Sequence, residues 1–375
     1  MRLLVSHDYK SDGLFAHKIV YMAPLKALIT EKLAEWRAKF DKLHRLKCIE
    51  LTGDTVGDDE HDLALSHIIL TTPEKWDFVT RKYNKSSVDA LIRSVKLFMI
   101  DEIHVMGENS RGATIEAVIS RMKFFNIKYP LRFIAVSATI PNIGDFAEWL
   151  RENDGITNAI VYNLDEKFRP VKVEKFVIGF RCPPAMSDYV FDLSLNYKLA
   201  DVIEQYAQSK PTLVFCSSRK GTVQAATILV ESASYIKDEA HKKTLKEMAT
   251  KIKDTQLRDL IVNYGVCCHH AGLDKSDRSL IESLFLSSNL LVLFSTSTLS
   301  MGINLPAHLV IIKSTKCYSE NQSYEYYSIT QMQQMIGRAG RPQFDKTAKA
   351  VILTKESDRA NYASFIEGKC FIESQ

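Results

Sequence analysis

Two adjacent acids, Asp101 and Glu102, directly follow the apolar run Leu97–Ile100. The run predicts a buried strand, and carboxylates at the carboxyl end of a parallel strand lie where open α/β sheets bind ligands. In a site that hydrolyses a nucleotide, the first acid holds Mg²⁺ and the second orients the attacking water. His104 completes the pattern D-E-x-H. Because this pattern is short, an ordinary charged strand end is the alternative interpretation.

A pair of arginines, Arg338 and Arg341, has only Ala339 and Gly340 between its members. These small residues leave the approach open, so both guanidinium groups can reach one polyanion. The spacing is typical of arginines that stabilise charge on a phosphoryl group. The alternative is a solvated basic turn, because exposed charges contribute little.

Hydroxyl groups and lysines recur where predicted strands pass into helices. They stand in the segments Ala23–Leu28, Thr71–Asp77, Ser137–Asn142, Ser295–Thr298 and Gly302–Pro306. Such turns suit phosphates, because loops and helix N-termini present free N–H groups that attract anions. Each segment by itself is also what a capped helix start requires. Their repetition favours a phosphate-binding role over a series of unrelated caps.

The elements that must position these residues alternate between short apolar runs and helical stretches. This alternation predicts an α/β fold with two parallel sheets, each covered by helices on both faces. The expected strands are Lys18–Met22, His67–Thr71, Val95–Ile100, Arg132–Ala138, Thr212–Cys216, Gly265–His269, Leu291–Thr296, His308–Lys313 and Ala348–Leu353.

The segment Glu166–Lys175 interrupts the alternation, because Pro170 disfavours helix and the apolar period is lost there. We therefore expect two domains, residues 1–165 and residues 166–375. The charged, helix-forming segment Ser232–Val262 is expected to be a peripheral helical part of the second domain. Its charges could not all be buried unpaired.

The bulk properties exclude several classes of protein. Of the 375 residues, 46% are apolar and 25% charged, as in globular proteins, and the formal net charge is only +4. Any nucleic-acid surface must therefore arise from local clustering of charge. No apolar run reaches the roughly 18 residues of a membrane span, and the sequence opens on no signal peptide. We expect a soluble intracellular protein.

Seven cysteines without C-x-x-C spacing favour a reduced compartment over a disulfide framework. The cluster Cys267–His270 places four metal-ligand types in a row. However, consecutive residues of a strand point to opposite faces, so one tetrahedral ion could not gather all four. We therefore expect no zinc site there.

Taken in order, the polar segments resemble motifs Ia to VI of the superkiller-type superfamily 2 helicases. The motifs read APLKAL, TTPEKWD, DEIH, SATIPN, LVFCSSRK, STSTLSMGINLPA and QMIGRAGR, and they extend over nearly the whole chain. Within this family, ELTGDT, RGATIEAVISRMK, FDLSLNYKLADVI and GRAGRPQFD resemble the helicases of meiotic crossover formation. The spliceosomal unwinding helicases and the activating-signal cointegrator helicases share the motor motifs, so both remain alternatives.

The resemblance implies two tandem RecA-like domains that form an ATP-dependent motor. It implies 3′ to 5′ unwinding of DNA in meiotic recombination and a location in the nucleus. The implied cofactors are ATP and Mg²⁺. The implied partners are nucleic acid, DNA before RNA, and meiotic recombination proteins, with no membrane.

The family motifs also assign roles to individual residues of this chain. Catalytic roles fall to Asp101, which would also bind the metal, and to Glu102, His104, Gln334, Arg338 and Arg341. Nucleotide contacts fall to the same acids and arginines and to Ser137, Thr139, Gly302 and Asn304. The residues implied to hold the nucleic-acid strand are Pro24, Lys26, Thr72, Arg111 and Gly112 in the first domain, and Arg219, His270, Gly272, Thr296 and Thr298 in the second.

A hairpin between motifs V and VI splits the duplex in this family, and Thr315–Tyr327 occupies that place. Tyr318, Tyr324 and Tyr326 are candidates for stacking on bases. A hairpin packed by its own aromatic rings is an equally good interpretation.

The sequence departs from the family pattern at one point. It contains no G-x-x-x-x-G-K-[ST] loop, whose amides and lysine cradle the β- and γ-phosphates. We therefore expect a fragment, a short isoform or an incomplete gene model of an active helicase. Residues 1–375 by themselves are expected to be inactive. The alternative from another class is a catalytically inactive scaffold that binds nucleic acid or a protein partner.

Overall fold

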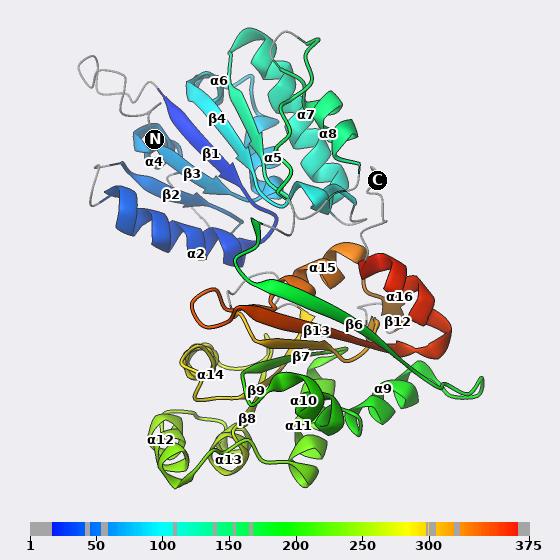
Figure 1. The fold of residues 1–375 in the computed structure, drawn as a ribbon. Helices are drawn as coiled ribbons and strands as arrows, with labels where there is room; N and C mark the ends of the chain where they lie inside the picture. The colour runs from blue at the N-terminus through cyan, green and yellow to red at the C-terminus, as the bar shows by residue number, and fades with distance from the viewer. Residues whose placement is uncertain are drawn as a thin grey trace. The chain divides into compact units, whose positions relative to one another are not determined.

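Two compact units make up the computed structural model, and they divide between Asn163 and Leu164 (Figure 1). The structure describes residues 17–41, 46–53, 59–107, 111–137, 140, 142–152, 155–164, 168–297, 299, 305–318 and 323–366. Asp165, at which the sequence predicts the boundary, lies outside these ranges.

The first unit is built on a five-stranded parallel sheet with the strand order β2-β3-β1-β4-β5. Its strands are β1 (Lys18–Met22), β2 (Cys48–Leu51), β3 (Ile68–Thr71), β4 (Val95–Ile100) and β5 (Arg132–Ala135). Its helices are α2 (Lys26–Trp36), α4 (Asp59–Leu65), α5 (Pro73–Thr80), α6 (Ser86–Ser94), α7 (Gly112–Lys128) and α8 (Ile143–Leu150). A π-helical segment, Arg37–Asp41, follows α2, and a 3₁₀ helix, Ile103–Gly107, follows β4.

Strand β1 shows why the sheet needs helices on both faces. All five of its residues are buried. Val20 and Met22 belong to one apolar cluster, whereas Ile19 and Tyr21 belong to a second. Because successive side chains of a strand point to opposite faces, the two clusters are the two sides of the sheet.

The second unit is built on a six-stranded sheet with the order β6-β13-β10-β7-β9-β8, and its strands are again parallel. Its strands are β6 (Lys172–Phe180), β7 (Thr212–Cys216), β8 (Val266–His269), β9 (Val292–Thr296), β10 (Leu309–Ile312) and β13 (Thr347–Lys355). Its helices are α9 (Asp188–Asn196), α10 (Leu199–Ala207), α11 (Arg219–Ser232), α12 (Glu239–Ala249), α13 (Thr255–Tyr264), α14 (Lys275–Leu286), α15 (Ile329–Gly337) and α16 (Arg359–Ile366).

A separate two-stranded antiparallel hairpin, β11 (Lys316–Tyr318) and β12 (Tyr324–Tyr326), stands between β10 and α15. The sequence predicts a hairpin at this place, and the structure confirms it. Its tip, residues 319–322, lies outside the described ranges.

The predicted fold class is confirmed, since both large sheets are parallel and every predicted strand is present with small differences at its ends. The segment Ser232–Val262 is helical as expected, and it contributes α12 and most of α13. Two strands escape the sequence patterns. Strand β2 is short, and β6 begins inside the segment Glu166–Lys175, which the sequence analysis assigns to an irregular linker.

The prediction of an irregular Glu166–Lys175 is wrong for its last residues, and the reason is the position of β6 in the sheet. The strand pairs only with β13, over nine residues from Lys172 to Phe180. This edge strand has apolar and charged residues in alternation at its start and is mostly half-buried. It therefore lacks the continuous apolar run that marks the central strands.

None of the described helices combines the length and the apolar character that a membrane crossing requires.

Candidate functional site

The acid pair lies at the carboxyl end of β4, as the sequence predicts. The backbone N–H of Asp101 donates to the carbonyl oxygen of Met22 at 2.9 Å, which aligns this end of β4 with β1. The Tyr21 hydroxyl of β1 donates to the carboxylate of Asp101. Burial and then this hydrogen bond raise the pKa of Tyr21, so the phenol keeps its proton. Asp101 is therefore oriented by a permanent donor on the neighbouring strand.

Glu102 adopts a left-handed backbone conformation, with φ of 54°. A non-glycine residue in this region costs on the order of 1–3 kcal/mol and persists only where its surroundings enforce it. Here the Glu102 N–H donates to Asp101 Oδ1 at 3.1 Å, and the 3₁₀ helix starts at the next residue. The sharp turn leaves the Glu102 side chain 30% exposed, so its carboxylate can reach a ligand.

His104 joins the ends of β4 and β5. Its side chain is only 1% exposed, and Nδ1 lies 3.1 Å from Ser137 Oγ and 3.3 Å from Glu102 Oε2. Burial lowers the pKa of His104 to about 4, so the imidazole is neutral near pH 7. Its 3.3 Å contact with Glu102 is therefore not an ion pair near pH 7. The structure thus brings Glu102, His104 and Ser137 together, while Thr139 lies outside the described residues.

A second cluster in the first unit gathers predicted nucleic-acid residues. Arg111 Nη1 donates to the carbonyl oxygen of Pro24 at 2.6 Å, and Arg111 Nε lies 3.5 Å from Glu74 Oε1. Thr72 caps α5 by accepting the N–H of Lys75 at 3.4 Å. The loops after β1 and β3 and the start of α7 therefore meet at Arg111.

The remaining predicted residues of this cluster differ in their surroundings. Gly112 cannot carry a side chain, because a Cβ there would lie 2.0 Å from the Met106 carbonyl oxygen. Its role is close packing against the 3₁₀ helix. Lys26, the first residue of α2, is exposed.

In the second unit, Arg219, His270 and Gly272 come together. Arg219 opens α11, and Ser218 caps this helix by accepting the N–H of Gly221 at 3.0 Å. The Gly272 N–H donates to His270 Nδ1 at 3.2 Å, and a Cβ at Gly272 would lie 3.6 Å from Arg219 Nη1. Burial and the neighbouring Arg219 lower the pKa of His270.

Thr296 ends β9 and pairs in register with Cys216, the last residue of β7. Arg219, His270 and Thr296 therefore follow neighbouring parallel strands and share the carboxyl edge of the sheet. Thr298 lies outside the described residues.

The arginine pair lies at the opposite edge of this sheet. The N–H of Ala307, which precedes β10, donates to the Arg338 carbonyl oxygen at 2.9 Å, and the Gly340 N–H donates to Ala307 O at 2.7 Å. Gly340 has φ of +106°, and a Cβ there would lie 2.9 Å from Val171 Cβ, so only glycine fits between the two arginines. Gly302 and Asn304 lie outside the described residues.

Arg341 is anchored within the second unit. Its guanidinium makes two hydrogen bonds to the Asp345 carboxylate, at 2.8 and 3.1 Å, and one to Ser288 Oγ at 3.0 Å. Asp345 is itself buried and also contacts His308 at 3.1 Å and Lys210 at 3.4 Å. The sequence motifs did not predict Asp345, although its position four residues after Arg341 is a usable signal.

Helix α15 connects the two edges of the second sheet. It starts directly after the hairpin, with a capping box formed by Ser328 and Gln331, and ends at Gly337, directly before Arg338. Gln334 lies on this helix, and its buried Oε1 atom has no hydrogen-bond partner among the described residues. Such an acceptor is the kind of group that a ligand satisfies.

The cysteine and histidine cluster is divided among different neighbours. The Cys267 and Cys268 thiols are buried and contact the carbonyl oxygens of Cys268 and Thr222. Burial raises the pKa of both thiols. His269 pairs with Glu282 at 2.8 Å. Within the described ranges, no group of three potential ligand residues is placed to hold a metal ion.

Comparison with known proteins identifies the family. Residues 7–146 match the model of the DEAD/DEAH box helicases, and residues 195–343 match that of the helicase conserved C-terminal domain. The chain is 50% identical over 367 residues to the probable ATP-dependent DNA helicase HFM1 of Xenopus tropicalis. The matched region is 95% of this chain and 27% of that protein.

More distant relatives extend the comparison. The ATP-dependent DNA helicase MER3 of Saccharomyces cerevisiae is 38% identical, over 95% of this chain and 29% of its own length. The activating signal cointegrator 1 complex subunit 3 of Bos taurus is 36% identical, over 95% of this chain and 16% of its own length. The chain thus spans less than a third of each of these relatives. Its two matched models and its similarity to HFM1 and MER3 show that it belongs to the superfamily 2 helicases, in the HFM1 and MER3 group.

Proposed function

We propose that the two units are the motor of an ATP-dependent helicase that moves 3′ to 5′ on DNA and acts in the nucleus in meiotic recombination. One observation carries the proposal. Arg219, His270 and Thr296 follow adjacent strands at one sheet edge, and the hairpin follows the next strand, β10, at the same edge. A row of phosphate-binding groups that ends at a hairpin fits a single strand led away from a duplex.

The acids of the first unit fit a nucleotide with Mg²⁺. Asp101, oriented by Tyr21, would hold the metal, and the partly exposed Glu102 would orient the attacking water. Bound Mg²⁺ would neutralise phosphate charge. The neutral His104, 3.3 Å from Glu102 and 3.1 Å from Ser137, would link these two residues. In the second unit, Gln334 and Arg338 are the residues assigned to the γ-phosphate side, and the unpartnered Gln334 Oε1 supports this assignment.

We propose DNA and not RNA as the substrate, because the relatives with 38% identity or more are named DNA helicases. The motor residues alone do not discriminate, because contacts to phosphates and sugars carry little base information. The cointegrator relative is 36% identical to this chain.

The test uses a longer chain that joins these residues to a G-K-T loop, and it measures strand separation on partial duplexes. We expect separation of DNA with a 3′ overhang and none with a 5′ overhang. Duplex RNA with the same overhangs serves as the comparison. Separation of RNA alone would support an RNA helicase, and binding without any ATP hydrolysis would support the inactive scaffold.

Residues 1–375 alone provide the matched control. Because no G-x-x-x-x-G-K-[ST] pattern occurs in them, they are expected to bind single-stranded DNA but to hydrolyse little ATP. Strong DNA-stimulated hydrolysis by residues 1–375 would show that the nucleotide site is assigned wrongly.

A further inference from the structure

The hairpin needs support from outside itself. Its two strands are only three residues each, and such a hairpin is marginally stable in water. Tyr318 and Tyr324 pack ring against ring, with centroids 5.6 Å apart, yet Tyr318 and Tyr326 remain 51% and 54% exposed. A single cross-strand ring pair cannot fix the direction in which the hairpin points.

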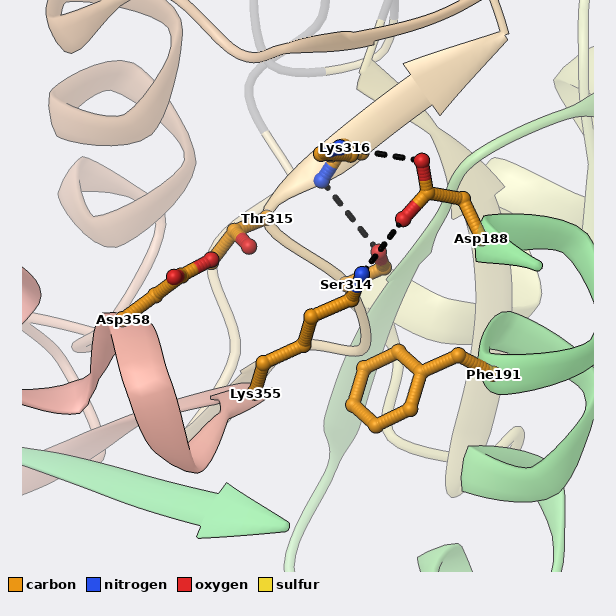
Figure 2. Close-up of a pocket in the computed structure, with 7 residues that line it drawn as sticks. All are labelled: Asp188, Phe191, Ser314, Thr315, Lys316, Lys355 and Asp358. Carbon is orange, nitrogen blue, oxygen red and sulfur yellow. Dashed lines mark hydrogen bonds and ion pairs between the residues drawn. The ribbon is translucent and has the colours of Figure 1, made fainter. Parts of the chain in front are cut away.

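Asp188, the first residue of α9, provides one support. Its carboxylate binds Lys316 Nζ of β11 at 2.9 Å through one oxygen and Lys355 Nζ of β13 at 2.7 Å through the other (Figure 2). The three side chains are 28%, 18% and 23% exposed, so solvent screens these pairs only in part. The first residue of the hairpin is thereby tied both to the sheet and to α9.

Asp192, one helical turn further along α9, provides a deeper support. It accepts Lys313 Nζ at 3.1 Å and Ser217 Oγ at 2.9 Å. Lys313 is completely buried and also donates to Asn196 Oδ1 at 2.7 Å. Apolar residues of similar volume stabilise a core at least as well as a buried ion pair, so the pair is best explained by the geometry that it imposes.

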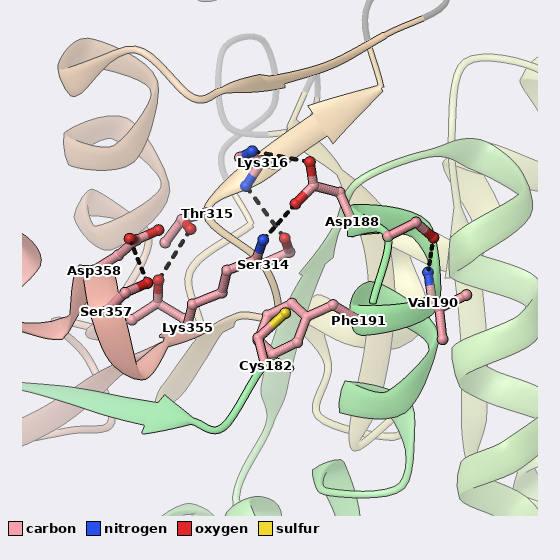
Figure 3. A network of polar contacts seen from close by, with 12 residues as sticks. Cys182, Asp188, Val190, Phe191, Ser314, Thr315, Lys316, Lys355, Ser357 and Asp358 are labelled. Carbon is pink, nitrogen blue, oxygen red and sulfur yellow. Dashed lines mark hydrogen bonds and ion pairs between the residues drawn. The ribbon is translucent and has the colours of Figure 1, made fainter. Parts of the chain in front are cut away.

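The same network reaches the predicted nucleic-acid residues. The Tyr318 N–H donates to the carbonyl oxygen of Ser217 at 3.1 Å, and Ser217 stands two residues before Arg219. The hairpin is therefore hydrogen-bonded to the loop of Ser217 and Ser218 that leads into Arg219, here called the Arg219 loop. On its other strand, Tyr326 lies under Lys316 Nζ at 4.6 Å and donates to Asp358 at 3.1 Å. Asp358 belongs to the polar network drawn in Figure 3.

We propose that Asp188 and Asp192 are positioning residues that hold the hairpin at a fixed place relative to the Arg219 loop, so that strand movement is converted into duplex separation. This inference rests on the proposed helicase function. Neither aspartate needs to touch DNA or ATP. Loss of Asp188 should uncouple ATP hydrolysis from strand separation without stopping hydrolysis.

The test compares Asp188→Asn with Asp188→Glu and with Asp201→Asn in the longer chain that carries the G-K-T loop. Asp201 is a matched control because it also stands in the first turn of a nine-residue helix of this unit and is exposed. Two quantities are measured: amide hydrogen exchange in residues 316–318 and 324–326, and base pairs separated per ATP hydrolysed.

For Asp188→Asn we expect hairpin exchange to rise up to about fivefold, as for a shift of about 1 kcal/mol in a local opening equilibrium. We expect base pairs per ATP to fall severalfold, while DNA-stimulated hydrolysis stays within about twofold of the parent. Asp188→Glu should restore both quantities at least in part, and Asp201→Asn should match the parent.

Unchanged hairpin exchange in Asp188→Asn would overturn the inference, whatever the helicase does. If the parent chain separates no duplex, the proposed function fails, but the exchange measurement still decides whether Asp188 holds the hairpin. Asp192→Asn is measured in the same way. If it does not fold, the Asp188 variants remain decisive, because their pairs lie at the partly exposed rim of the network.

Discussion

The end of β4 in the first unit and the ends of β7 and β10 in the second have the same place in a parallel sheet but carry different charged groups. In the first unit the edge ends in the acids Asp101 and Glu102, beside a neutral His104. In the second unit it carries Arg219 and the lysines Lys313 and Lys316, and the lysines are paired with aspartates of α9. The acids suit a cation, whereas the exposed Arg219 suits a polyanion and the two lysines are held in ion pairs. The same position in a parallel sheet therefore carries groups for different ligands.

The largest expected effect is a loss of stability in the second unit when the buried Asp192 is replaced. Asp192→Ala leaves the Lys313 ammonium buried without its carboxylate, which typically costs about 3–5 kcal/mol of unfolding free energy. Chemical denaturation of the second unit measures it. The double variant Asp192→Leu with Lys313→Met removes both charges and should recover most of the loss. A double variant as unstable as Asp192→Ala would contradict the view that the pair serves geometry.

The next effect is a loss of ATP hydrolysis without a loss of DNA binding when Glu102 is replaced. Glu102→Gln, in the chain that carries a G-K-T loop, should lower ATP hydrolysis by about a hundredfold or more, as for loss of one transition-state contact. Affinity for single-stranded DNA should be unchanged, because Glu102 is assigned to the nucleotide and not to the DNA strand. The exposed Glu148→Gln on α8 is the control. Equal losses of hydrolysis in both variants would contradict the assignment of Glu102.

Arg219→Ala tests the polyanion side of the comparison. We expect affinity for single-stranded DNA to fall about tenfold and the salt dependence of binding to weaken by roughly one phosphate contact. Fluorescence anisotropy at several salt concentrations measures both. Lys243→Ala, on the exposed surface of α12, should change neither. Similar losses from the two variants would indicate diffuse charge attraction instead of a defined row.

The smallest effect is a pH dependence at the rim of the hairpin support. Hydrogen bonds from Lys355 and then Lys316 lower the pKa of Asp188 below its ordinary value of 3.8. A carboxyl group with a lowered pKa stabilises the fold fully above its ordinary value, and this contribution is lost as pH falls through the lowered pKa. Asp188→Asn should therefore cost up to about 1 kcal/mol at pH 6 and progressively less below pH 4. A cost that does not change between these pH values would indicate that the carboxylate charge is not what matters.

The sequence predicts the central strands and the positions of the motifs well, because both depend on local patterns. Lys18–Met22 is a continuous apolar strand after its first residue, and Asp101 follows another such strand. In contrast, β6 reads as irregular because an edge strand lacks this pattern. The assignment to the helicases rests on the motifs, because their order and spacing are specific.

The partners of the functional residues could not be predicted in the same way. Arg341 is bound by Asp345 and Ser288, and Ser288 stands 53 residues away in the sequence. Lys316 meets Asp188 across 128 residues. Contacts over such separations depend on the order of the strands in the sheet, which the amino-acid pattern of a single strand does not encode. The sequence therefore identifies the arginine pair but not the carboxylate that anchors one member of it.

Helix α15 is the covalent link between the hairpin and the Arg338 loop. It has nine residues, and at 1.5 Å per residue it spans about 13 Å. The hairpin joins one end of it, and the Arg338 loop joins the other. Because a helix is stiffer than a loop, α15 fixes the spacing between the hairpin and the Arg338 loop.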